Sequence, residues 1–425
     1  MIKISPVTKC EGSLIPPPDK SISHRALLLA SIASGRSEIR NLSQAEDVQA
    51  TRKALQCLGK KLRASGPAAV IEGGGFPASG ETIDCRNSGT TARLLLGLLA
   101  PEKLSVRITG DDSLTNRPME RVISPLKLMG ANISYLDRFG YLPVSLKGMK
   151  LHGVSYELPV ASAQVKSALL LAALRATGET TIIEPIGTRD HTERMLTMMD
   201  ADIEIKKSER GAEIKVNPSQ LSPLKIKIPG DFSSAAYFIA LGVLRPGKSL
   251  TISDVNLNPT RLGFLEVLRD MGATIKVDLE DVMPEPRGKI VVTGGTLKGI
   301  SIERERIPSM IDEIPLLAVV ATQAIGKTVI RGAQELRVKE SDRIGTITEG
   351  LRTMGASIDA LQDGFNIEGP TILRGASLDS SRDHRIAMCF TVASALANSD
   401  SLIGNEECVS ISYTDFFKDF KELSS

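Results

Sequence analysis

The segment LRVKESDRI, residues 336–344, brings charges of both signs together, since five of the seven residues from Arg337 to Arg343 are charged. If this segment opens a helix, Lys339 and Arg343 are four residues apart and share one face. Two such cations could hold a phosphate or a carboxylate, and Glu340 beside them could transfer a proton or orient them. The alternative is a solvated helix start, because charged side chains are mostly exposed.

Small polar residues and cations also gather where several apolar segments begin. These starts contain Lys20, Ser21 and Arg25; Asn87, Ser88 and Gly89; Ser162, Gln164 and Lys166; and Asp383, His384 and Arg385. A helix N-terminus carries unpaired amides and about half a positive charge. A cation at that position opposes the helix dipole, so an anionic ligand would explain the recurrence. If the segments are related by symmetry, their starts lie in one region and form an anion site.

The apolar segments belong to a pattern that occurs six times along the chain. Each copy begins with a polar start and an almost wholly apolar helix, predicted at residues 23–35, 91–100, 166–178, 233–247, 314–326 and 384–397. A Gly turn, a short β-branched run and a charged amphipathic helix follow, as in residues 45–59, 117–131, 191–201, 261–273 and 343–356. A helix that is apolar all round is buried, whereas a single apolar stripe marks a half-exposed helix. Each copy therefore has an inner helix and an outer helix.

Strand candidates such as TTIIE and KIVVTGG complete each copy as a βαβαββ unit, which predicts an α/β fold with sheets packed against helices. The length favours two or three domains, and we expect two domains with three units in each. Residues 1–17 with 230–425 form one domain and residues 18–229 the other. The PG turn at Pro229 and Gly230 marks one crossing, and the stiff run Pro16 to Pro18 marks the second. The N-terminal strand MIKISPV is expected to precede the first unit.

Composition excludes several classes of function. The formal net charge is +2, with 4% aromatic residues and no Trp, which argues against nucleic-acid binding. The N-terminus lacks a signal-peptide pattern, and no apolar run approaches the roughly 18 residues that span a bilayer, so we expect a cytoplasmic protein without membrane contact. The five cysteines are scattered and the four histidines form no HExxH pattern, so no metal site is predicted.

A P-loop pattern occurs in GVLRPGKS, residues 242–249. A phosphate-binding loop of this type follows a strand and opens a helix. Here the apolar helix comes first and the strand SLTISDV comes afterwards. The same Gly turn ends other apolar helices, as in ASGRS and AIGKT, so we interpret it as a helix stop.

Seven segments together resemble the 5-enolpyruvylshikimate-3-phosphate synthase family: PPDKSISHRALLLA, NSGTTARLL, GDDSLTNRPMERV, ASAQVKSALLLA, IDEIPLLA, LRVKESDRI and DHRIAM. They span almost the whole chain in the family's order. The resemblance implies an enolpyruvyl-transferase fold of six βαβαββ repeats, three per domain, with the active site in the cleft between the domains. It also implies transfer of the enolpyruvyl group of phosphoenolpyruvate to the 5-hydroxyl of shikimate 3-phosphate, with release of phosphate and without metal or organic cofactor.

The sequence leaves open two alternatives to this function. The related UDP-N-acetylglucosamine enolpyruvyl transferases carry a cysteine in a mobile loop, and the corresponding GDDSLTNRP has none, which favours shikimate 3-phosphate over a UDP-sugar. An inactive anion-binding relative would be expected to lack residues such as Lys20, Asp312, Glu340 or Arg385, and all four are present. We expect a monomer that binds these small molecules, with glyphosate as a candidate competitive inhibitor.

The resemblance also implies roles for individual residues. Contacts to phosphoenolpyruvate are expected from Lys20, Gly89, Arg117, Gln164, Arg343 and Arg385. Contacts to shikimate 3-phosphate are expected from Lys20, Ser21, Arg25, Ser162, Ala163, Gln164, Arg189, Asp312 and Lys339. Among them Asp312 is the expected general base, and Glu340, with Lys20 as an alternative, protonates the methylene carbon.

Each assignment has a competing interpretation. Asp312 could cap the helix that follows it, and Glu340 could orient Lys339 or Arg343 through a salt bridge. His384 could be a packed histidine, and Arg93 could pair with the other domain. Ile411 and Glu335 stand where some family members have a lysine and an asparagine, and Arg189 lies in a loop that differs from theirs, which leaves the response to glyphosate open.

Overall fold

The computed structural model describes residues 1–77 and 80–425, with only the backbone given for residues 64 and 65. Contacts divide the chain into two compact units: Met1–Pro17 with Pro229–Ser425, and Pro18–Ile228. We call them the terminal unit and the central unit. Pro229, expected in the central unit, belongs to the terminal one.

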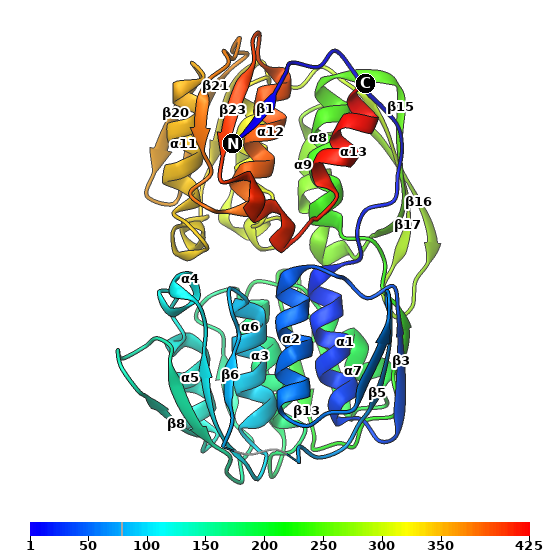
Figure 1. The fold of residues 1–425 in the computed structure, drawn as a ribbon, viewed down its shortest axis with the longest axis vertical. Helices are drawn as coiled ribbons and strands as arrows, with labels where there is room; N and C mark the ends of the chain where they lie inside the picture. Colours follow the sequence, from blue (N-terminus) through cyan, green and yellow to red (C-terminus); the bar gives the residue numbers. More distant parts are fainter. Residues whose placement is uncertain (78–79) are drawn as a thin grey trace. The chain divides into compact units, whose positions relative to one another are not determined.

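The central unit contains three repeats, each with a four-stranded sheet (Figure 1). The first repeat comprises α1 (Lys20–Ile32), β3 (Arg36–Arg40), α2 (Glu46–Cys57), β4 (Leu62–Ser65), β5 (Ala68–Glu72) and, from the end of the unit, β14 (Lys225–Lys227). The second comprises β6 (Thr82–Asp84), α3 (Gly89–Leu99), β7 (Ser105–Thr109), the short α4 (Asp112–Thr115), α5 (Glu120–Leu128), β8 (Asn132–Tyr135) and β9 (Val144–Lys147). The third comprises β10 (Ser155–Glu157), α6 (Ala163–Ala173), β11 (Thr180–Glu184), α7 (His191–Met198), β12 (Ile203–Lys207) and β13 (Ala212–Val216).

The terminal unit follows the same plan, except that the sheet of its last repeat has three strands, in the order β1-β23-β22. Its first repeat comprises β2 (Cys10–Leu14), α8 (Phe232–Leu244), β15 (Pro246–Asn256), α9 (Gly263–Asp270), β16 (Thr274–Asp281) and β17 (Arg287–Gly294). Its second comprises β18 (Ser301–Ile302), α10 (Ile314–Ala321), β19 (Gly326–Ile330), α11 (Arg343–Thr353), β20 (Ser357–Leu361) and β21 (Gly364–Gly369). The last comprises β22 (Ser377–Asp379), α12 (His384–Leu396), β23 (Ser401–Gly404), α13 (Phe416–Ser424) and β1 (Ile2–Ile4). The α/β fold of βαβαββ repeats predicted from the sequence is therefore confirmed over the described residues.

Strand pairing differs from the chain order at three places. The strand β2 precedes α1 in sequence but pairs with β15 of the terminal unit, and β14 precedes α8 but pairs with β3 of the central unit. The N-terminal strand β1 precedes the first repeat in the chain, as expected, and pairs antiparallel with β23 of the last repeat. The strand β2 thus completes the first sheet of the terminal unit, and β14 completes the first sheet of the central unit. The N-terminal strand β1 completes the last sheet of the terminal unit.

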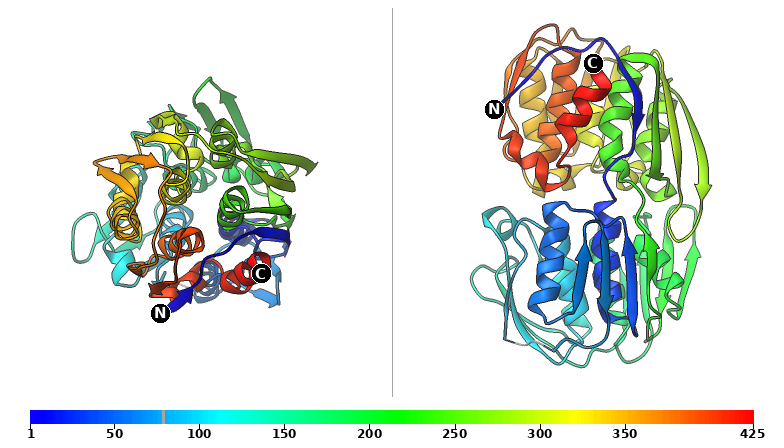
Figure 2. Two further views of the ribbon diagram at one scale, coloured as in Figure 1. Left: turned by 90° about the horizontal axis from the view of Figure 1, so that it is seen from above. Right: turned by 45° about the vertical axis from the view of Figure 1, so that its right-hand side comes forward.

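The inner helices are the apolar ones, as predicted. Residues Phe232–Val243 of α8 are all buried, whereas α9 exposes Glu266, Arg269 and Asp270. Figure 1 shows α8, α9 and β15 to β17 on one side of the terminal unit, with α11, β20 and β21 on the other. The C-terminal helix α13, red in Figure 2, packs beside α8 through Phe416, whose ring centroid lies 5.5 Å from that of Phe238.

The P-loop pattern at residues 242–249 covers the end of α8 and the beginning of β15, so that a helix comes first and a strand follows. This order does not fit a phosphate-binding loop, but the expectation that its Gly is the helix stop is wrong, because α8 ends at its C-cap Arg245 and Gly247 lies within β15. In the part of the chain that the structure describes, no helix combines the length and the apolar character needed to cross a membrane.

Candidate active site

Five of the six inner helices described begin at a residue whose side chain caps the helix, and α10 is the exception. Acceptor oxygens of this kind come from Asp19, Ser88, Ser162, Asp231 and Asp383, each taking a hydrogen bond from an amide two or three residues further on. Three of the five caps are carboxylates, which the positive end of the helix dipole favours. The protein therefore supplies part of the negative charge that balances the cations at these helix starts, through the carboxylates of Asp19, Asp231 and Asp383.

Lys20, the first residue of α1, pairs with a carboxylate that the sequence analysis missed. Its Nζ lies 2.7 Å from Oδ2 of Asp47 on α2, and both side chains are largely buried. Asp47 lies in the first turn of an outer helix, where acidic residues are common for reasons of helix stability alone. Nothing in the local sequence distinguishes Asp47 from its exposed neighbour Glu46.

Arg25 lies one turn further along α1 and is 4% exposed. Its Nε donates to Oγ1 of Thr192 at 2.8 Å, its Nη2 to Oγ of Ser167 at 2.9 Å, and its Nη1 to the carbonyl of Ser21 at 3.0 Å. The side chain of Arg25 therefore bridges α1, α6 and α7. Of the other residues expected near it, Ser162 caps α6, Ala163 begins that helix, and Arg189 lies half-buried before α7.

A second group of cations surrounds the start of α3. A Cβ added to Gly89 would lie 2.8 Å from Nη1 of Arg93, so one of the two would have to shift, and 3.5 Å from Nη1 of Arg117, which is an ordinary contact. Arg117 donates to Oδ1 of Asn87 at 2.6 Å and to Oγ of Ser113 at 2.9 Å. The structure thus brings Gly89 and Arg117 together, as the sequence predicted.

Arg93 contacts its own unit. Its Nη1 donates to Oε1 of Gln164 at 2.8 Å and its Nη2 to the carbonyl of Pro118 at 3.2 Å. Gln164 in turn donates to Oγ1 of Thr90 at 2.9 Å. These contacts join α3 to α6 and place Gln164 beside the arginine cluster.

Lys166 does not contribute a ligand-facing cation, contrary to the expectation from its helix start. Its side chain is 1% exposed, and its Nζ lies 2.6 Å from Oε1 of Glu193 and 3.0 Å from the carboxylate of Glu184. The two partners follow 18 and 27 residues later, so the ion pairs are invisible in the local pattern.

In the terminal unit Arg343 is the centre of a carboxylate cluster. Its Nε lies 2.7 Å from Oδ2 of Asp383, its Nη2 lies 2.6 Å from Oε2 of Glu340, and its Nη1 lies 3.5 Å from Oδ1 of Asp312. Burial by itself would lower the pKa of Arg343, but the charges of Asp383 and Glu340 outweigh this effect, so the pKa lies above its ordinary value. Arg343 is 1% exposed and stays charged.

Lys339 does not share a helix face with Arg343, because α11 begins only at Arg343 with Asp342 as its cap. Lys339 ends a short 3₁₀ turn, Gln334–Val338, in an extended conformation. The expectation of an i, i+4 pair is therefore wrong. The cation that Glu340 contacts at 2.6 Å is Arg343, three residues along the chain, so the orienting salt bridge considered for Glu340 exists.

Asp312 lies between two arginines. Besides Arg343, Nη2 of Arg385 lies 3.4 Å from its Oδ2. The residue at the cap position of α10 is Glu313, so Asp312 is not the helix cap. Burial opposes the charge of Arg385, but Asp312 and then Tyr237 and Glu313 raise its pKa well above the ordinary value. The pair of cations favours the ionised form of Asp312.

Glu313 is a further residue that the sequence analysis missed. Its Oε1 accepts from Oγ of Ser233 and lies 3.9 Å from Nη1 of Arg385. Ser233 in turn accepts from Nη2 of Arg261 at 2.6 Å. His384, the first residue of α12, is 1% exposed. Adjacency to Asp312 was the one available signal for Glu313.

The arrangement of repeats has a counterpart among solved structures. The enolpyruvyl transferase NikO from Streptomyces tendae matches with a TM-score of 0.78 at 17% identity, covering 99% of this chain and 96% of that one. At this identity the likeness defines the fold, which is that of an enolpyruvyl transferase.

The family follows from closer matches. The family model EPSP synthase (3-phosphoshikimate 1-carboxyvinyltransferase) matches residues 4–420, and the chain belongs to this family. A 3-phosphoshikimate 1-carboxyvinyltransferase of Thermodesulfovibrio yellowstonii is 47% identical over 415 residues, 96% of each chain, and one of Alkaliphilus oremlandii is 45% identical over 425 residues, 99% of each. EPSP synthase from Acinetobacter baumannii matches with a TM-score of 0.86 at 38% identity, covering 99% and 98% of the two chains. The resemblance found in the sequence is confirmed.

Proposed function

We propose that this chain transfers the enolpyruvyl group of phosphoenolpyruvate to the 5-hydroxyl of shikimate 3-phosphate and releases phosphate. Membership of the family supports the reaction, and the observation that carries the chemistry is the Asp312 carboxylate between Arg343 and Arg385. A carboxylate kept ionised by two cations can accept a proton from a hydroxyl group.

Both substrates are polyanions, so binding them together requires fixed cations. The proposed contacts to phosphoenolpyruvate are Lys20, Arg117, Arg343 and Arg385, with the Gly89 amide and Gln164. Arginine suits carboxylate and phosphate because its planar group makes paired hydrogen bonds. In Arg343 the Nε and Nη2 groups are directed to Asp383 and Glu340. Nη1, which lies 3.5 Å from Oδ1 of Asp312, is the nitrogen proposed to meet the ligand.

The proposed contacts to shikimate 3-phosphate divide by the part of the ligand that they would bind. Arg25 and Ser21 would bind its carboxylate, and Ser162, Arg189 and Lys339 its phosphate. Lys20, Ala163 and Gln164 are proposed as further contacts to this substrate. The support is strongest for Arg25, because its guanidinium is held by three directed hydrogen bonds. Asp312 would contact the hydroxyl that reacts.

In the first step, the 5-hydroxyl oxygen bonds to C2 of phosphoenolpyruvate while its proton passes to Asp312. C3 takes up a proton from Glu340, with Lys20 as the alternative donor, which gives a tetrahedral intermediate. In the second step C3 returns that proton as the bond from C2 to the phosphate oxygen breaks. The proton on Asp312 passes to the departing phosphate, so both side chains regain their starting states.

The salt bridge between Glu340 and Arg343 is compatible with proton transfer by Glu340. An ionised Glu340 must first be protonated, and its exposed fraction of 19% gives it access to solvent. We further propose that the enzyme is a cytoplasmic monomer and that glyphosate competes with phosphoenolpyruvate.

Phosphate release tests the reaction. The purified chain is mixed with phosphoenolpyruvate and either shikimate 3-phosphate or UDP-N-acetylglucosamine. Release with the first acceptor alone is the expected result. Release with the second alone would replace the acceptor while keeping the chemistry, and release with neither would overturn the proposal.

A further inference from the structure

The guanidinium group of Arg25 is oriented by two hydroxyl groups from different helices. Ser167 on α6 and Thr192 on α7 accept from Nη2 and Nε, and their oxygens lie 2.7 Å from each other. Both side chains are 1% exposed. The three polar groups therefore form a closed, buried triangle.

The triangle fixes the direction of the guanidinium plane. Nε and Nη2 define one side of that plane, and the two hydroxyls meet this side as a carboxylate would. The Ser21 carbonyl binds Nη1 from the preceding turn of α1. The orientation of the edge formed by Nη1 and Nη2 is consequently set by Ser167 and Thr192.

A buried ionic cluster holds the two hydroxyls at this spacing. Lys166 precedes Ser167 and Glu193 follows Thr192, and their charged groups are 2.6 Å apart. Glu184 at the end of β11 binds the same Nζ at 3.0 Å and accepts from the amide of Thr188 at 2.9 Å. Burial raises the pKa of Glu193, although Lys166 opposes this effect. An ion pair between residues adjacent to the hydroxyls links α6 to α7 where Arg25 is bound.

We propose that Ser167 and Thr192 are positioning residues that set Arg25 in the orientation in which it binds the carboxylate of shikimate 3-phosphate. This inference rests on the proposed function. It adds two residues that act through Arg25 and contact no reacting atom. They are expected to affect the acceptor substrate selectively, because their hydrogen bonds end on the arginine assigned to its carboxylate.

A purely structural role would give a different result. If Ser167 and Thr192 served only to accept hydrogen bonds from the buried Arg25, they would stabilise the fold and would not affect the binding of one substrate more than the other. The split between the KM for shikimate 3-phosphate and the KM for phosphoenolpyruvate distinguishes the two roles. Thermal unfolding measured in parallel reports the structural part.

Thr192→Val is the main variant, because valine keeps the shape of the side chain and removes the oxygen. Removing a hydrogen bond to a charged group is expected to raise the KM for shikimate 3-phosphate roughly 10- to 100-fold, with the KM for phosphoenolpyruvate changed less than about twofold. Thr192→Ser restores a hydroxyl and should recover most of the loss. Ser167→Ala provides a second, independent variant should Thr192→Val fail to fold.

Thr180→Val is the matched control. Thr180 lies in β11 of the same repeat, is 0% exposed, and its Oγ1 has no hydrogen-bond partner among the described residues. Its replacement should leave both KM values unchanged. If the folded Thr192 or Ser167 variant keeps the wild-type KM for shikimate 3-phosphate, or raises both KM values equally, the positioning role is overturned. Wild-type protein that releases no phosphate with shikimate 3-phosphate overturns the proposed function itself, so the two failures are distinct.

Discussion

Arg343 and Asp383 meet side by side, with Nε 2.7 Å from Oδ2 and Nη2 3.2 Å from Oδ1. The same Oδ1 accepts the amide of Arg385 at 2.9 Å, because Asp383 caps α12. One carboxylate, 0% exposed, therefore positions two arginines, the first by its side chain and the second by its backbone. Removing either partner of such a pair leaves a buried charge without compensation.

Replacing Arg343 by lysine tests this relationship. A lysine keeps the charge but cannot make the paired contact with Asp383 and still direct a second nitrogen toward a ligand. We expect Arg343→Lys to raise the KM for phosphoenolpyruvate by roughly ten- to 150-fold, equivalent to about 1.5 to 3 kcal/mol. Steady-state phosphate release at varied phosphoenolpyruvate measures the change.

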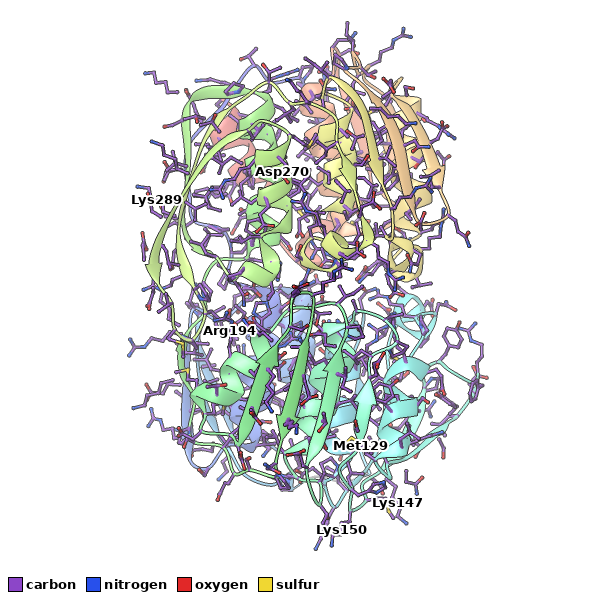
Figure 3. The ribbon with its side chains drawn as sticks, turned by 180° about the vertical axis from the view of Figure 1, so that it is seen from behind. Met129, Lys147, Lys150, Arg194, Asp270 and Lys289 are labelled. Carbon is purple, nitrogen blue, oxygen red and sulfur yellow. The ribbon has the colours of Figure 1, made fainter. Side chains whose placement is uncertain are left out.

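Arg306→Lys is a suitable control in the same unit. Arg306 pairs at 2.7 Å with Asp270, which is labelled in Figure 3, and both side chains are substantially exposed. Exposed pairs contribute about 0 to 1 kcal/mol, so this variant should keep wild-type kinetics. An unchanged KM in Arg343→Lys would remove Arg343 from the proposed binding site.

Replacing Asp312 by asparagine tests its role as the base. Asparagine keeps the size of the side chain but cannot take up the hydroxyl proton, so turnover should fall by roughly 100-fold or more. Binding of shikimate 3-phosphate should remain measurable by calorimetry, which suits a chain that lacks Trp. Asp359→Asn, at a carboxylate 76% exposed, serves as control. Turnover of Asp312→Asn at the wild-type rate would exclude Asp312 as the base.

The repeated fold was predictable because helix burial leaves a direct trace in composition. Residues 233–244 are apolar on every face, and the corresponding α8 is buried almost throughout. The partners of β1, β2 and β14 were not predictable in the same way. These strands have three to five residues, and their pairing joins segments about 190 to 400 residues apart in the chain, which local patterns do not record.

The site was predictable in the identity of its arginines and less so in their partners. Arg343, Arg385 and Asp312 lie together as the motifs suggested. Lys166 was misinterpreted because Glu184 and Glu193, which neutralise it, are distant in sequence. The position of Lys339 depended on where α11 begins, and helix ends are the least certain feature of a sequence pattern.

The pH dependence of the free energy of unfolding should show that His24 is neutral in the folded protein. This residue is 0% exposed, its Nδ1 lies 2.7 Å from Oγ1 of Thr51, and burial lowers its pKa to about 3 despite the opposing charge of Asp47. The unfolded chain takes up a proton at this histidine near pH 6.5, whereas the folded chain does so only near pH 3. Stability from the neutral histidine is therefore present above pH 6.5 and is lost as the pH falls toward 3.

The expected size of this loss follows from the linkage. Between pH 7.5 and pH 5 the free energy of unfolding of wild type should fall by about 2 kcal/mol relative to His24→Gln, at about 1.4 kcal/mol per pH unit below 6.5. Urea titrations at the two pH values measure the difference. His152→Gln, at an exposed histidine, should follow the wild-type profile. If His24→Gln also follows it, His24 does not stay neutral on folding.

The close approach of α3 and α6 gives a last prediction. A Cβ at Gly97 would lie 2.1 Å from the carbonyl oxygen of Ala168, so an alanine forces the two helices apart. The intrinsic gain in helix propensity of about 1 kcal/mol is smaller than the expected packing cost of about 1 to 3 kcal/mol or more. Gly97→Ala should therefore lower the free energy of unfolding in urea titrations.

The same displacement should reach the arginine cluster, because the Arg93 to Gln164 hydrogen bond joins these two helices. We expect Gly97→Ala to raise the KM for phosphoenolpyruvate as well as to lower stability. Gly75→Ala is the control, since a Cβ at Gly75 meets nothing within 4 Å, and it should change stability by less than about 0.5 kcal/mol. If Gly97→Ala proves as stable as wild type, helix spacing does not depend on the missing side chain. If it loses stability but keeps its KM, Gln164 is not held in place by the packing of α3 on α6.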